Sequence, residues 1–129
     1  MHFFDALVHV FGPVRSNVLH LRTPIRAAGY LELERARVRW FLSIAAEDLP
    51  AACSKGQTTW RSLQLDGSEI EFSNGFTDLH VESYREILAG HGYGIEDVRP
   101  SIEIVSALRT AAVEWTRGER HPAARPDMA

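Results

Sequence analysis

The stretch 29-GYLELERARVRWFLSI-44 decides the fold, because it alternates apolar and polar residues twice in succession. In its first half, Leu31 and Leu33 share one side of the chain, opposite two glutamates. In its second half, Val38 and Trp40 begin another run of alternate apolar residues. Side chains of a β-strand point to opposite faces in turn, so the pattern predicts two neighbouring strands with one apolar face.

Further strands are predicted on both sides of this stretch. Residues 14–23 read as a strand, and residues 45–57 as a loop. The segment 58-TTWRSLQLDGSEIEFS-73 predicts a hairpin around Asp66-Gly67, a favoured two-residue turn. Strands joined in sequence by short turns favour an antiparallel sheet.

Helical patterns lie before and after the strands. Residues 1–11 are apolar on nearly every side and precede a Gly-Pro stop. Thr77 or Asp78 is a possible cap for a second helix. Asp97 is a possible cap for a third, whose helical spacing of apolar residues continues to Trp115.

The predicted fold class is therefore α+β, with an open, mainly antiparallel sheet of about five to six strands and helices packed on one face. Residues 1–115 are predicted to form one domain, and the apolar-poor residues 116–129 a disordered tail. The opposite sheet face would be bare, either as a solvated ladder of glutamate–arginine pairs or as a docking face for another subunit. We place on it Glu32, Glu34, Arg37, Arg39, Glu69 and Glu71.

Composition narrows the cellular setting. The formal net charge of −3 gives no basic footprint for nucleic acid, and the sequence has no apolar run long enough for a membrane span. A single cysteine, Cys53, cannot form an internal disulfide and has no histidine near it in sequence, so it is interpreted as incidental. We expect a cytoplasmic protein with neither nucleic acid nor membrane as a partner.

His2, Asp5 and His9 form one polar stripe on the first predicted helix. Two imidazoles and a carboxylate could hold a metal ion, although no fourth ligand lies nearby in sequence. A histidine oriented by a carboxylate could instead transfer protons. Spacing alone also allows the ordinary alternative, in which these residues have no chemical role.

A second group lies at the start of the next helix, where Asp78, His80 and Tyr84 are close in sequence. Asp78 could be a helix cap beside a partly buried tyrosine, or the group could face a substrate. The glycine-rich segment 90-GHGYG-94 follows a predicted helix instead of a strand, so it is interpreted as a turn and not as a dinucleotide-binding loop.

Several motifs together resemble the C-terminal half of a Gfo/Idh/MocA-type dehydrogenase, and most closely its sugar-nucleotide branch. The similarity extends over residues 2–113. The motifs are 2-HFFD-5, 28-AGYLELERARVRWFLSI-44, 71-EFSNGFTDLH-80 and 83-SYREILAGHGYGIEDVRPSIEIV-105.

This resemblance implies both a fold and a site. Complete members of the family bind NAD(P) in an N-terminal Rossmann domain, which also supplies a catalytic lysine in a Glu-Lys-Pro segment. Their second domain is α+β and carries substrate and subunit contacts. A Gly-x-His-x-x-Asp pattern in the family maps its catalytic histidine onto His2 and its aspartate onto Asp5. Lys55 does not match the catalytic lysine, and we expect residues 1–115 to be the substrate and oligomerisation domain without the Rossmann domain.

The resemblance also implies a reaction. The C3 hydroxyl of a UDP-N-acetylglucosaminuronate-like substrate would lose a hydride to NAD, in the biosynthesis of surface polysaccharide such as lipopolysaccharide O-antigen. Candidate substrate contacts are Tyr30, Arg39, His80 and Tyr84. We expect a homo-oligomer formed through the sheet face, and a chain that by itself binds no NAD and is inactive. The alternative is a non-catalytic module that binds a ligand or dimerises.

Overall fold

The computed structural model of the 129-residue chain describes residues 2–53, 56–75 and 78–128. The chain divides into two compact units, one formed by residues 1–44 with 93–129 and the other by residues 45–92. Lys55 and the possible helix cap Thr77 lie outside the described residues.

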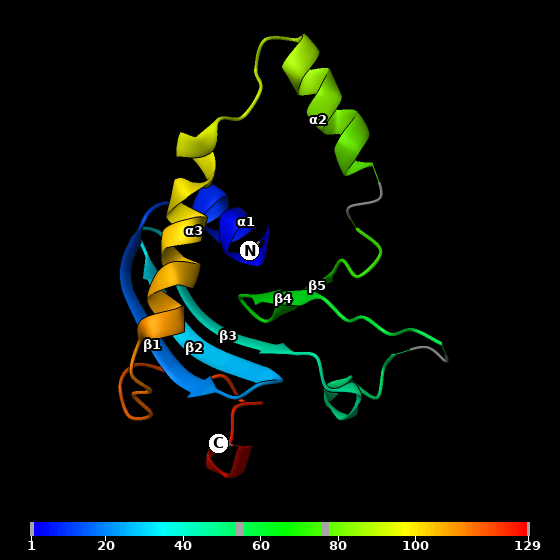
Figure 1. Cartoon of the computed structure of the whole chain (residues 1–129). Coiled ribbons are helices and arrows are strands. Elements are labelled where there is room, and N and C mark those ends of the chain that lie inside the picture. Colours follow the sequence, from blue (N-terminus) through cyan, green and yellow to red (C-terminus); the bar gives the residue numbers. More distant parts are fainter. Residues whose placement is uncertain (1, 54–55, 76–77, 129) are drawn as a thin grey trace. The chain divides into compact units, whose positions relative to one another are not determined.

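The first unit is built on a three-stranded antiparallel sheet (Figure 1). Its strands are β1 (Val14–Arg22), β2 (Arg26–Leu33) and β3 (Arg37–Ser43), in that order across the sheet. The stretch 29–44 supplies most of β2 and β3, as its alternation predicts. The edge strand β1 has irregular register between Val14 and Ser16 and between Leu19 and Leu21.

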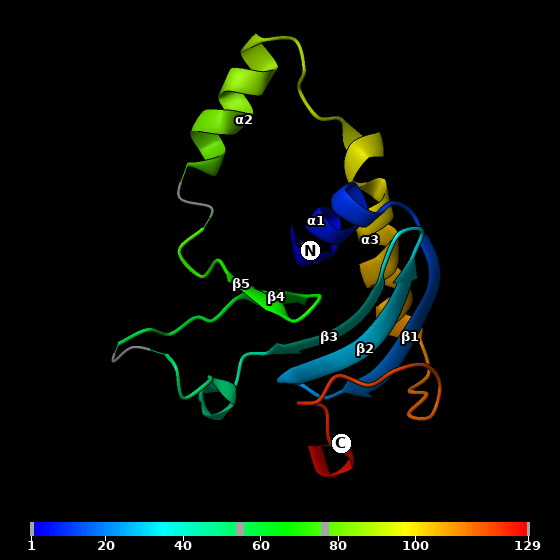
Figure 2. The same cartoon turned by 180° about the vertical axis from the view of Figure 1, so that it is seen from behind.

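Two helices, α1 (His2–Phe11) and α3 (Ile95–Thr110), cover one face of this sheet (Figure 2). Phe4 of α1 packs edge-on against Trp40 of β3, with ring centroids 5.4 Å apart. Ile104 and Leu108 of α3 are buried. The predicted packing of helices on one side of an antiparallel sheet is thus confirmed for α1 and α3.

The third helix differs from its predicted limits at both ends. It begins at Ile95, and the Asp97 carboxylate accepts a hydrogen bond from the backbone N–H of Gly94 at 2.6 Å. It ends at Thr110, five residues before Trp115. The Arg22 guanidinium of β1 donates hydrogen bonds to the carbonyl oxygens of Leu108, Arg109 and Ala111, at 3.2, 2.9 and 3.1 Å. These bonds cap the C-terminal end of α3.

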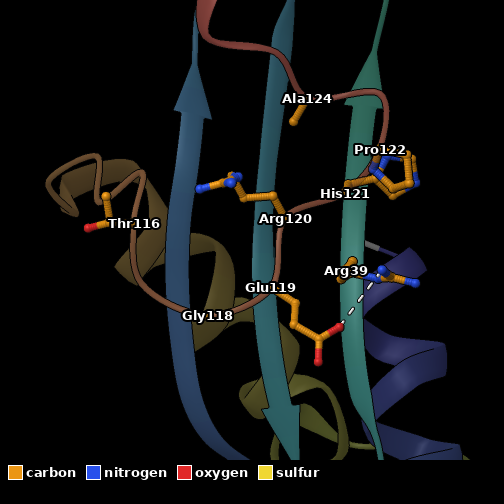
Figure 3. Close-up of a pocket in the computed structure, with 8 residues that line it drawn as sticks. All are labelled: Arg39, Thr116, Gly118, Glu119, Arg120, His121, Pro122 and Ala124. Carbon is orange, nitrogen blue, oxygen red and sulfur yellow. Dashed lines mark ion pairs between the residues drawn. The ribbon is translucent and has the colours of Figure 1, made fainter.

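The opposite face of the sheet is not bare. Residues 113–128, called here the C-terminal segment, cross it from β1 to β3 (Figure 3). Val113 pairs with Leu19 as an isolated parallel bridge, and the chain ends in a short 3-10 turn, η2 (Pro126–Met128). The predicted disordered tail therefore differs from the structure over residues 116–128.

Apolar side chains explain why this segment stays on the sheet. Ala124 lies in one cluster with Leu21 and Ala28, which are at most 1% exposed. Phe41, Trp115 and Met128 pack around that cluster. These residues are scattered among charged ones in the sequence, so the segment has no periodic pattern that reveals its packing.

The second unit contains a hairpin, a short 3-10 turn η1 (Ala46–Asp48) and a helix. The hairpin pairs β4 (Ser62–Leu65) with β5 (Ser68–Glu71) around a turn at Asp66 and Gly67, both with positive φ. It forms a separate two-stranded sheet, so the prediction of one sheet with five to six strands is not confirmed.

Consequently, Glu69 and Glu71 belong to a different sheet from Glu32 and Arg39, and the single charged face predicted from the sequence is wrong. The helix of this unit is α2 (Leu79–Leu88). No described residue between 45 and 92 is buried. Within the described parts of the chain, no helix has the length and apolar character needed to cross a membrane.

Candidate functional site

The polar stripe on α1 is oriented by the apolar side of the same helix. Phe4 and Leu7 are 3% and 4% exposed against the core, whereas His2 and His9 are exposed and Asp5 is half-buried. His2 and Asp5 therefore lie on a helix that is fixed to the sheet by its other side, and the imidazole of His2 is open to a ligand. Among residues 2–53, 56–75 and 78–128, no group of three histidine, cysteine or acidic side chains could hold a metal ion.

Tyr30 and Arg39 lie on the other side of the sheet. They are cross-strand partners, so their side chains share a face. Arg39 lies in β3 immediately before Trp40, whose ring contacts Phe4 of α1. Successive side chains of a strand point in opposite directions. The structure therefore separates Tyr30 and Arg39 from His2 and Asp5 by the thickness of the sheet.

Tyr30 is covered by the C-terminal segment. Its side chain is only 9% exposed, and a Cβ added at Gly118 would meet its ring at 2.8 Å. A ligand can touch this ring only if the segment moves. Arg39, in contrast, has a side chain that is half exposed.

An open cavity of about 560 Å³ lies between Arg39 and the C-terminal segment (Figure 3). Arg39 makes a loose ion pair with Glu119 at 3.8 Å. Arg120 stacks on Trp115 and points away from Arg39, so the two guanidinium groups do not converge on one point. The cavity is lined by Arg39, Thr116, Gly118, Glu119, Arg120, His121, Pro122 and Ala124.

Two histidines fix the segment around this cavity. His20 is fully buried, and its Nε2–H donates to the carbonyl oxygen of Arg117 at 2.6 Å. His121 stacks on Phe41 with centroids 5.7 Å apart, and its Nδ1 accepts from the backbone N–H of Ala123 at 3.1 Å. Partial burial, with a smaller effect of the nearby Arg39 charge, lowers the pKa of His121 below its usual value.

Sequence reasoning did not find these contacts. His20 is one of four consecutive buried residues in β1, beside an irregularity in the register. A search for strict alternation of apolar and polar residues does not detect such a run. His121 lies in the polar run 117-RGERH-121, where only the neighbouring Trp115 and Ala124 hint at an apolar partner. The contacts that order the segment come from distant parts of the chain.

His80 and Tyr84 lie on α2 in the second unit, and both are exposed, Tyr84 by 67%. The predicted partly buried tyrosine is therefore wrong. Asp78 precedes α2, but its side chain makes no capping hydrogen bond. The segment 90–94 joins α2 to α3, which agrees with its interpretation as a turn. Cys53 is a free, half-buried thiol.

Comparison with solved structures shows that this fold is that of part of a dehydrogenase crystallised with NAD. The resemblance predicted from the sequence is confirmed at this level. Two of the similar structures are of the WlbA (WbpB) dehydrogenase from Thermus thermophilus.

Its complex with NAD and α-ketoglutarate matches with a TM-score of 0.87 and 48% sequence identity, over 94% of this chain and 40% of that chain. Its complex with NAD and UDP-GlcNAcA matches with a TM-score of 0.86 and 46% identity, over 94% of this chain and 39% of that chain. The chain thus spans about two fifths of the length of these structures. No family model matches the chain.

Proposed function

We propose that this chain forms the substrate-binding part of an NAD-dependent sugar-nucleotide dehydrogenase. The proposed reaction is oxidation of the C3 hydroxyl of a UDP-N-acetylglucosaminuronate-like sugar, in the cytoplasmic synthesis of a surface polysaccharide such as O-antigen. The observation that supports it is the 46% identity, over 94% of the chain, to a dehydrogenase crystallised with NAD and UDP-GlcNAcA.

His2 is the proposed acid–base residue, which takes the proton of the reacting hydroxyl. Imidazole is the side chain most often used for such transfers. The His2 side chain is exposed, so a sugar can reach it. Phe4 and Leu7 anchor α1 to the core, and this restricts the motion of the helix that carries His2. Asp5, three residues later on the same helix, is proposed to orient the imidazole.

His80 and Tyr84 remain proposed substrate contacts, because each side chain is exposed and polar. Arg39 and Tyr30 lie on the sheet face away from His2, so we do not propose that they contact the sugar that reacts at His2. A homo-oligomer is also proposed, although the C-terminal segment occupies the sheet face first assigned to it.

NAD supplies the hydride acceptor in such an enzyme, and we propose that this chain by itself does not bind it. Dinucleotide phosphates bind at a glycine-rich turn between a strand and a helix. The glycine-rich segment of this chain, residues 90–94, instead follows the helix α2. We therefore assign no NAD contact to this chain.

A hybrid enzyme tests the proposal directly. The matching segment of the Thermus dehydrogenase is replaced by this chain, and NADH formation is followed with UDP-GlcNAcA as substrate. We expect activity in the hybrid, and a loss of about 10²-fold or more in kcat on His2→Gln. The matched control is His9→Gln, an exposed histidine on the same helix. A folded hybrid without activity, or full activity in His2→Gln, contradicts the proposal.

Calorimetry on the 129-residue chain distinguishes the proposed part of a dehydrogenase from the alternative, a non-catalytic ligand-binding module. We expect no heat of binding with NADH, because the chain offers no phosphate-binding turn in its described parts. Tight NADH binding would contradict the proposal that this chain by itself does not bind the cofactor. Binding of UDP-GlcNAcA by this chain, together with an inactive hybrid, would instead support a non-catalytic ligand-binding module.

A further inference from the structure

The open cavity on the sheet face away from α1 has the charge of an anion site (Figure 3). Its volume is about 560 Å³, and all of its lining residues belong to the first unit. Arg39 of β3 forms one wall, and residues 116–124 of the C-terminal segment form the other. The charged side chains in the lining are Arg39, Glu119 and Arg120, so positive charge predominates. A hollow with this charge attracts anions.

Arg39 has donors that no protein group uses fully. Its side chain is half exposed, and its ionic partner among the described residues is the Glu119 carboxylate, 3.8 Å away. This separation is too long for a hydrogen bond, so only charge holds the pair. By contrast, the Arg99 guanidinium donates two hydrogen bonds to Glu96, at 2.9 and 2.7 Å. Arg39 can therefore offer two parallel N–H groups to an oxyanion.

His121 places another donor beside Arg39. Its ring stacks on Phe41, which lies two residues after Arg39 and on the same face of β3. The Nδ1 atom of His121 accepts a hydrogen bond from the backbone N–H of Ala123 at 3.1 Å, so the proton of the neutral ring is on Nε2. His121 also lines the cavity, and its Nε2–H can donate to a ligand there.

The charge of His121 would respond to such a ligand. Partial burial and, to a smaller extent, the Arg39 charge lower the pKa of His121. An anion bound between the two side chains would stabilise the imidazolium and so raise this pKa. By linkage, the anion must bind more tightly as the pH falls through the pKa of His121.

Glu119 is an internal competitor for Arg39. Its side chain is 62% exposed, and a loose exposed ion pair contributes little to stability. The carboxylate can therefore turn into solvent at small cost when another anion binds Arg39. Neutralising Glu119 should then strengthen anion binding, because the competitor and its repulsion are both removed.

We propose that Arg39 and His121 form a binding site for a dianionic oxyanion, either sulfate or a terminal phosphate, and that Glu119 competes with it for Arg39. Arg39 and a protonated His121 carry two positive charges, which match the two negative charges of such a group. The phosphates of a dinucleotide or a nucleotide sugar are bridged and carry one charge each, so they suit this site less well. The inference goes beyond the proposed dehydrogenase and does not depend on it.

Sulfate is the first probe, because its charge stays constant over the pH range in which histidine titrates. Backbone amide chemical shifts of the 129-residue chain are followed as sulfate replaces chloride at constant ionic strength. We expect saturable shifts at residues 118–122, and tighter binding at about pH 5.5 than at about pH 7.5. The imidazole resonances of His121 should show a pKa that sulfate raises, and His121→Gln should remove most of the pH dependence.

Two variants change the affinity in opposite directions. Arg39→Met should weaken sulfate binding about tenfold or more, because charge-assisted hydrogen bonds are lost. Glu119→Gln should strengthen it about threefold, and a gain in affinity cannot result from a damaged fold. Arg15→Met and Glu34→Gln are the matched controls, since these two residues form an equally loose and exposed pair, at 3.9 Å, that does not line the cavity. Both controls should bind sulfate as the wild type does.

Inorganic phosphate and glycerol phosphate are then compared at about pH 7.5, where both are largely dianionic. Tighter binding of the ester would identify the end of a larger phosphorylated molecule as the ligand, and equal binding would identify the free ion. Failure of both to bind would overturn the assignment to phosphate.

Two further results would overturn the site itself. Unchanged sulfate affinity in both Arg39→Met and Glu119→Gln would show that the ion does not bind Arg39. Saturable sulfate binding that leaves the pKa of His121 unchanged would show that the ion lies away from this ring.

Discussion

Gly29 of β2 lies where the neighbouring strands β1 and β3 leave no room for a side chain. A Cβ at this position would be 2.3 Å from the Val18 carbonyl oxygen and 2.6 Å from the Trp40 ring. Trp40 in turn carries the contact with Phe4 of α1. The absence of a side chain at one position thus permits the helix layer to pack on the sheet.

Gly29→Ala should lower the free energy of unfolding by about 3 kcal/mol, because the methyl group must push a backbone carbonyl and a buried ring apart. Urea unfolding followed by tryptophan fluorescence measures this. Gly94→Ala is the control, since its Cβ would meet only the Asp97 carboxylate at 3.8 Å. A loss of under about 1 kcal/mol is expected there. Equal losses in both variants would contradict the packing argument.

His121 gives the fold a dependence on pH. Its pKa is lowered in the folded chain by partial burial and by Arg39, so the unfolded chain binds more protons below about pH 6.5. Its neutral form therefore stabilises the fold fully above that pH, and this contribution is lost as the pH falls through the lowered pKa. His121→Gln should remove part of the decline in the urea midpoint between pH 7.5 and 5. Identical declines would exclude this residue as a cause.

At the scale of elements, Arg22 determines where α3 ends. Its guanidinium supplies donors to three carbonyl oxygens that the helix itself leaves unpaired. The sequence pattern predicted a helix as far as Trp115, because the spacing of apolar residues continues past Thr110. A side chain from a distant strand overrides that local preference.

Arg22→Met should cost about 1 kcal/mol of stability, and amide exchange should accelerate at residues 108–111. Methionine keeps most of the aliphatic stem but has no donor. Arg15→Met, on the same strand, removes a loose ion pair to Glu34 at 3.9 Å and should cost less than about 0.5 kcal/mol. A helix end that exchanges at the wild-type rate in Arg22→Met would contradict the cap.

Strands and turns with a clear sequence pattern could be predicted, but the strands with which they pair could not. The alternation in residues 29–44 identified β2 and β3, and Asp66-Gly67 identified the β4–β5 turn. Alternation does not say which strands pair, so the hairpin was wrongly added to the main sheet. The spacing of His2 and Asp5 placed them on one helix, but it did not show that Tyr30 lies on the other side of the sheet.

At the scale of the molecule, the two units differ in their cores. The unit of residues 1–44 and 93–129 has buried residues from both helices, all three strands and the C-terminal segment. The unit of residues 45–92 has none among its described residues, and its exposed apolar side chains include Val81, Ile87 and Leu88 of α2. A ten-residue helix and a hairpin of two four-residue strands have little stability without such burial.

Hydrogen exchange should therefore separate the two units in the isolated chain. Amides of α2, β4 and β5 should exchange at least about 10²-fold faster than those of β2, whose residues are largely buried. Mass spectrometry of peptic fragments measures both sets in one sample, with β2 as the internal reference. Equal protection of α2 and β2 would show that the second unit has a source of stability other than its own packing.

The packing of Ala124 and Gly118 also determines which substitutions and truncations the C-terminal segment tolerates. Chain ends rich in arginine, proline and glycine are commonly trimmed or tagged as dispensable. Here those two small residues occupy space left by Tyr30, Leu21 and Ala28, so larger replacements should be rejected as strictly as in the hydrophobic interior. Shortening this protein from its carboxyl end should accordingly reduce its solubility.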